Sequence, residues 1–158
     1  MDLRRLRAGE WIAALGGAAL LASLFMGWYE LPTSATETGW EAFAVVDLLL
    51  AAVALFAIAL VPVTASQRVP AIPLAQATLV AIAGKLAALL ILIRIAWAPG
   101  DASGVEPGAW LGFVAAGAIV AGGWIAMRDE RLSTPDRATD LTGAPNPEAP
   151  AIESLRAP

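Results

Sequence analysis

Three charged residues interrupt otherwise apolar stretches of the chain, and their types suggest chemistry: Asp47, Lys85 and Arg94. A carboxylate and two cations inside a membrane can form an ion pair that fixes helix register, or they can relay protons or ions. A charge at the centre of a bilayer costs about 2.5–3.5 kcal/mol on insertion scales, so we expect each side chain to have a partner or to face water. We therefore predict an intramembrane charge network of these three residues.

Depth and helical phase limit how the three charges can meet. At the rise of an α-helix, Asp47 lies about 9 Å and Arg94 about 4.5 Å below the outer ends of their helices, whereas Lys85 lies about 18 Å deep. Lys85 and Arg94 fall on opposite faces of one helix, so they cannot both point at the same neighbour. Arg94 can snorkel to the outer interface, and we expect Lys85 to face the bundle or an oligomer interface. The sequence leaves open whether Asp47 pairs with Arg94 or with Lys85.

The chain contains no histidine and no cysteine. It therefore lacks the commonest general base and metal ligand, and it has neither a thiol nucleophile nor a disulfide. No pairing of a nucleophile with a base stands out in the sequence, so we expect no catalytic residue, no cofactor site and no metal site, and the chain is not predicted to be an enzyme. A net charge of −4 argues against nucleic acid as a partner.

Four apolar runs must position the three charges. Hydrophobic residues make up 58% of the chain, charged residues make up 15%, and the mean hydropathy is +0.68. A soluble domain would carry about 25% charged residues. The sequence therefore predicts an all-α membrane protein, a four-transmembrane-helix bundle within residues 1–128, with spans at 11–28, 42–63, 71–97 and 110–127. Residues 129–158 have no apolar periodicity, which predicts a disordered C-terminal tail.

Small residues recur at four-residue spacing in the last run, as in Ala118, Gly122 and Ala126. Such spacing lets helix backbones approach closely in lipid. The pattern favours tightly packed helices with little room for a large pore.

Arginines flank one side of the predicted spans and carboxylates the other. The loops at 29–41 and 98–109 are acidic and contain no lysine or arginine. Because basic residues mark the cytoplasmic side, both termini are predicted to be cytoplasmic and the two acidic loops to face outward. The basic flanks are Arg4, Arg5, Arg7, Arg68, Arg128, Arg131 and Arg137.

Aromatic side chains lie at or near the ends of the four runs. An indole ring is apolar with one N–H donor, so it partitions to the headgroup layer and marks the membrane boundary. We predict an interfacial aromatic belt whose main role is anchoring; the alternative is that its outer part docks a partner or ligand. The belt comprises Trp11, Trp28, Tyr29, Trp40, Trp97, Trp110 and Trp124.

Two segments carry a resemblance to known proteins: GWEAFAVVDLLLAA, residues 39–52, and AWLGFVAAGAIVAGGWIAMRDER, residues 109–131. They resemble a group of small four-span bacterial membrane proteins that share a Trp-rich outer loop, an Asp in the second span and a Gly-Gly-Trp ending. The resemblance covers residues 1–131. It implies the bacterial plasma (inner) membrane as the location, and it implies no activity and no cofactor.

The sequence favours a structural, accessory or assembly-partner protein, because nothing in it requires chemistry. The expected partners are the lipid bilayer and either a second copy of the chain or another membrane protein. The alternative is a small transporter or ion-coupled channel subunit that uses Asp47, Lys85 and Arg94. A sensory or regulatory role through the tail is a third possibility.

Overall fold

Helices make up most of the computed structural model, which describes residues 6–42, 45–66, 71–98, 100 and 102–128. The predicted tail at 129–158 lies outside the described residues, as do Arg4, Arg5, Arg68, Arg131 and Arg137. In chain order the elements are α1 (Ala8–Ser23), β1 (Gly27–Glu30), β2 (Thr36–Thr38), α2 (Gly39–Ala42), α3 (Val46–Ile58), α4 (Leu60–Ser66), α5 (Ala71–Ala96), β3 (Gly104–Val105) and α6 (Pro107–Arg128).

Three of the described helical segments are long and apolar enough to cross a membrane. They are Val46–Ser66, which comprises α3 and α4 together, then Ala71–Ala96 and Pro107–Arg128, with lengths of 21, 26 and 22 residues. Helix α1 is also apolar but shorter, at 16 residues. The prediction of a mostly helical chain with helices that could span a membrane is therefore confirmed for these three segments.

The first apolar run does not stay helical to Trp28, because α1 ends at Ser23. The Ser23 hydroxyl donates to the Leu20 carbonyl at 2.7 Å, and the Trp28 indole Nε1 donates to the Ser23 carbonyl at 2.7 Å. Carbonyls in the last turn of a helix lack a partner within the helix, and the indole satisfies one of them. The chain therefore turns back over the end of α1 and enters β1.

The second run is also interrupted, and Pro62 explains where. Helix α3 ends at Ile58 and α4 begins at Leu60. Proline has no N–H to donate to the carbonyl four residues earlier, and its ring crowds that carbonyl. For Pro62 that carbonyl belongs to Ile58, where α3 ends.

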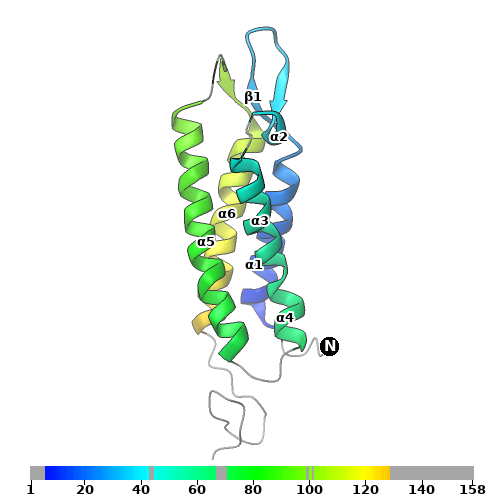
Figure 1. Cartoon of the computed structure of the whole chain (residues 1–158), viewed down its shortest axis with the longest axis vertical. Coiled ribbons are helices and arrows are strands. Elements are labelled where there is room, and N and C mark those ends of the chain that lie inside the picture. The colour runs from blue at the N-terminus through cyan, green and yellow to red at the C-terminus, as the bar shows by residue number, and fades with distance from the viewer. Residues whose placement is uncertain (1–5, 43–44, 67–70, 99, 101, 129–158) are drawn as a thin grey trace, which may run out of the picture.

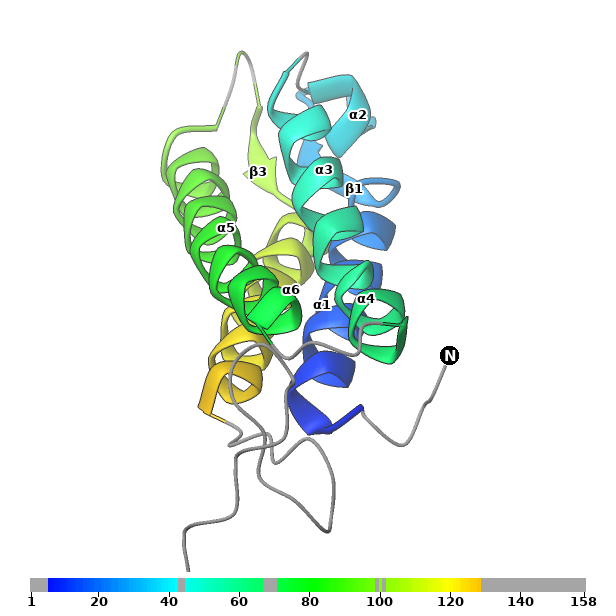
Figure 2. The ribbon, with the colours of Figure 1, turned by 60° about the horizontal axis from the view of Figure 1, so that its bottom comes forward.

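Helix α6 packs against α1 on one side and against α5 on the other, and α1 also packs against α3 (Figure 1 and Figure 2). Glycines let these backbones touch. A Cβ added to Gly9 of α1 would lie 2.5 Å from the Ala126 backbone nitrogen, and one added to Gly122 of α6 would overlap the Ala13 backbone. The small-residue pattern of the last run thus contributes directly to the contact between α1 and α6.

A small antiparallel sheet lies at one end of the helices, opposite α4, with strand order β2-β1-β3 (Figure 1). Tyr29 of β1 pairs with Glu37 of β2 and with Val105 of β3. The Glu41 carboxylate in α2 accepts bonds from the Thr38 backbone N–H and hydroxyl, both at 2.9 Å. These two bonds, the backbone one first, hold the pKa of Glu41 below its ordinary value.

Candidate functional site

Asp47 is buried in the first turn of α3, with 5% of its surface exposed. Its Oδ1 accepts a hydrogen bond from the Leu48 backbone N–H at 2.8 Å. A carboxylate near a helix N-terminus interacts favourably with the unpaired N–H groups and with the positive end of the helix dipole. The described contacts of Asp47 thus stabilise the start of its own helix.

Arg94 lies in the last turn of α5, where a cation interacts favourably with the negative end of the helix dipole. Its side chain is half-buried. Its backbone carbonyl accepts a hydrogen bond from the Tyr29 hydroxyl at 3.1 Å, which ties β1 to the end of α5.

Lys85 is exposed on α5 and does not face the interior of the bundle; its expected place at an oligomer interface stays a prediction. Its ammonium lies 5.4 Å from the centroid of the Trp124 ring, and the Arg128 guanidinium lies 5.1 Å from the same indole. Both are cation–π contacts with a residue of α6.

None of the described contacts joins two of the three charged residues that the sequence singled out. Asp47 bonds to Leu48, Lys85 contacts Trp124, and Arg94 is linked to Tyr29. A joint role for the three as a charge network stays a prediction. Among the described residues, no group of three or more Asp or Glu side chains is arranged to hold a metal ion.

The predicted aromatic belt divides into buried and exposed rings. Trp28 and Tyr29 are 0% exposed and belong to the core, where the Trp28 ring packs over Gly112 of α6. Trp40 is half-buried against Phe25, with ring centroids 5.7 Å apart. The rings that face outward, as an anchoring belt requires, are Trp11, Trp97, Trp110 and Trp124.

Burial raises the pKa of Tyr29 from 10.0 to about 12, and the nearby Arg94 charge only partly opposes this effect. Tyr29 is the single tyrosine of the chain, so phenolate absorbance reports on it alone. We expect Tyr29 in the folded protein to titrate near pH 12. The pKa of Tyr29 is higher in the folded protein than in the unfolded one, so its neutral side chain contributes to the free energy of unfolding. This contribution is fully present below pH 10 and is lost as the pH rises toward 12.

A detergent-solubilised sample can be titrated while its helix content is followed in parallel. A sample unfolded in denaturant should titrate near the ordinary value of 10.0. A folded sample in which Tyr29 also titrated near that value would contradict the burial of its side chain in the core.

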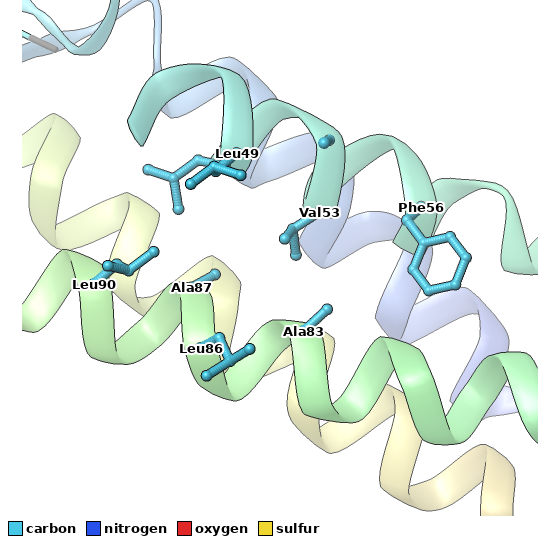
Figure 3. Close-up of a pocket in the computed structure, with 9 residues that line it drawn as sticks. Leu49, Val53, Phe56, Ala83, Leu86, Ala87 and Leu90 are labelled. Atoms are coloured by element: carbon cyan, nitrogen blue, oxygen red, sulfur yellow. The ribbon is translucent and has the colours of Figure 1, made fainter. Parts of the chain in front are cut away.

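An apolar groove of about 500 Å³ opens between α3 and α5 (Figure 3). No sequence pattern predicts this groove, because the separation of two apolar helices depends on how the other helices pack against them. Every side chain that lines it is apolar, so it offers no group for acid–base or metal chemistry. The lining residues are Leu49, Leu50, Ala52, Val53, Phe56, Ala83, Leu86, Ala87 and Leu90.

No protein-family model, curated protein or solved structure matches this chain. The groove and the exposed charges are therefore the features from which a function is inferred.

Proposed function

We propose that this chain is an accessory or assembly-partner protein of a bacterial plasma membrane, with four spans and both termini in the cytoplasm, and that it acts by binding and not by catalysis. The fourth span in this proposal is α1, which packs lengthwise against α6. Support for the orientation comes from the arginines at one end of the spans and the acidic loops at the other.

The observation that carries the binding role is the groove between α3 and α5. Its lining is apolar throughout, and Leu49 and Leu86 at its sides are 51% and 57% exposed. In lipid, helices associate through close van der Waals packing and not through the hydrophobic effect, so an unfilled groove along two helices is a place where a further helix gains contacts. The occupant that we propose is an apolar transmembrane helix of a partner.

Small residues within the groove favour a helix over a lipid chain. Ala83 and Ala87 are four residues apart on α5, and Ala52 faces them from α3. Ala87 is only 1% exposed, so it is Ala52 and Ala83 that let the backbone of a third helix approach closely, which an acyl chain does not require. The larger side chains, Val53 and Phe56, lie along the same side of α3 (Figure 3) and would pack against the occupant.

Site-specific photocrosslinking tests the proposal, because the chain has no cysteine of its own. A benzophenone attached at Val53→Cys should capture a protein partner in native membranes, since Val53 lines the groove. The matched control is Leu55→Cys, which is 57% exposed and lies on a different face of the same helix. We expect a discrete protein adduct from position 53 and much less from position 55.

The mass of the adduct identifies the source of the helix. An added mass of 16.3 kDa means a second copy of this chain, and any other discrete mass means a different membrane protein. Adducts with lipid only, or equal capture from both positions, would count against the docking role.

A further inference from the structure

Two cations from different helices converge on one indole. The Lys85 ammonium of α5 lies 5.4 Å from the Trp124 ring, and the Arg128 guanidinium of α6 lies 5.1 Å from it. Each cation is attracted to the ring, but this attraction does not neutralise either charge. The cluster therefore concentrates two positive charges around one aromatic side chain.

Within the described part of the chain, neither cation forms a salt bridge with a carboxylate; their contacts are those with Trp124. All three side chains are exposed, Trp124 by 44%. Since like charges repel, an anion placed between the two cations would be bound favourably. None of the described carboxylates supplies that anion.

The position of Lys85, Trp124 and Arg128 along the helix axes indicates what could supply the anion. Trp124 lies one turn from Arg128, the last residue of α6, or about 6 Å along the axis. Gly84, next to Lys85, packs against Ile119 and Val120, about one turn deeper than Trp124. The lysine side chain therefore reaches from a deeper level toward the helix end, as a snorkelling side chain does. In the four-span arrangement proposed above, this direction is toward the cytoplasmic headgroup layer.

We propose that Lys85, Trp124 and Arg128 form a binding site for the phosphate of an anionic phospholipid. A guanidinium binds phosphate oxygens in a bidentate manner, an ammonium adds a point charge, and an indole partitions to the headgroup layer. Ile82 and Leu89 lie about one turn to either side of Lys85 on the same face, and both are exposed. They provide apolar surface for the acyl chains.

Lipid binding to the full chain in mild detergent, measured by native mass spectrometry, tests the site. The probes are phosphatidylglycerol, phosphatidylcholine at the same mole fraction, and inorganic phosphate. We expect phosphatidylglycerol to bind preferentially. Lys85→Met and Arg128→Gln should each lower its apparent affinity about fivefold, because each removes one cation near the surface. Lys85→Arg retains the charge and should retain the affinity.

Each outcome bears on the proposal. Loss of phosphatidylglycerol affinity in both neutral variants, with retention in Lys85→Arg, supports it. Equal binding of both lipids, or neutral variants that bind like the unmodified chain, overturns it. Inorganic phosphate that competes as well as the lipid shows a free-anion site and overturns the lipid assignment. Arg128 lies at the end of a helix, so its variant carries the test if Lys85→Met fails to fold.

Discussion

Replacing Gly122 with leucine is expected to force α1 away from α6 and to lower the free energy of unfolding by about 3 kcal/mol or more. A Cβ at this position would overlap the Ala13 backbone and would lie 2.7 Å from the Gly9 carbonyl oxygen. Both neighbours are main-chain atoms, which cannot rotate away as the end of a long side chain can. The two helices must therefore separate, and their other contacts are lost together with this one.

Gly117 provides the matched control for that substitution. It lies in the same helix, is exposed, and would have no neighbour within 4 Å of an added Cβ. Gly117→Leu should change the free energy of unfolding by less than about 1 kcal/mol, mainly through helix propensity. Unfolding by a denaturing detergent, followed by circular dichroism, measures both variants. Equal destabilisation by the two substitutions would show that the close contact between α1 and α6 does not contribute to stability.

The apolar runs made the long helices predictable, because a stretch of about 20 apolar residues has few alternatives to a membrane helix. The four-residue spacing around Gly122 also pointed to close packing, and this glycine is at the contact with α1. The end of α1 was not predictable in the same way. The apolar residues continue to Trp28, but the helix ends at Ser23, whose carbonyl accepts hydrogen bonds from the Met26 backbone N–H and from the Trp28 indole.

The surroundings of the charged residues depended on tertiary contacts that a sequence pattern does not encode. Helical phase correctly separated Lys85 from Arg94, but it could not show that Trp124 of another helix lies within reach of Lys85. The predicted span at 42–63 placed Asp47 about 9 Å below the outer end of its helix. Because α3 begins at Val46, Asp47 lies in the first turn of the helix, and its carboxylate accepts a hydrogen bond from the Leu48 backbone N–H.

The proposed topology predicts an all-or-none pattern of labelling from the two sides of the membrane. The chain contains no cysteine, so a single introduced thiol is the only site for a maleimide. Three exposed positions report on the spans: Ala8 at the start of α1, Thr33 between β1 and β2, and Ser66 at the end of α4. Each substitution to cysteine is on the surface and should leave folding unchanged.

The position of Ala8 distinguishes four spans from three. If α1 crosses the membrane, Ala8 and Ser66 lie on the cytoplasmic side and Thr33 lies outside. If only the three longer segments cross, Ala8 lies on the same side as Thr33. Helix α1 has 16 residues and is about 24 Å long, which is shorter than the hydrocarbon core of a bilayer. The main competing outcome is therefore that α1 does not cross the membrane.

Labelling of intact cells with a membrane-impermeant maleimide, before and after permeabilisation, tests the central claim of a four-span protein with a cytoplasmic N-terminus most directly. We predict that Thr33→Cys is labelled in intact cells, whereas Ala8→Cys and Ser66→Cys are labelled only after permeabilisation. Labelling of Ala8→Cys together with Thr33→Cys in intact cells, or the reverse pattern at Thr33 and Ser66, would contradict the claim.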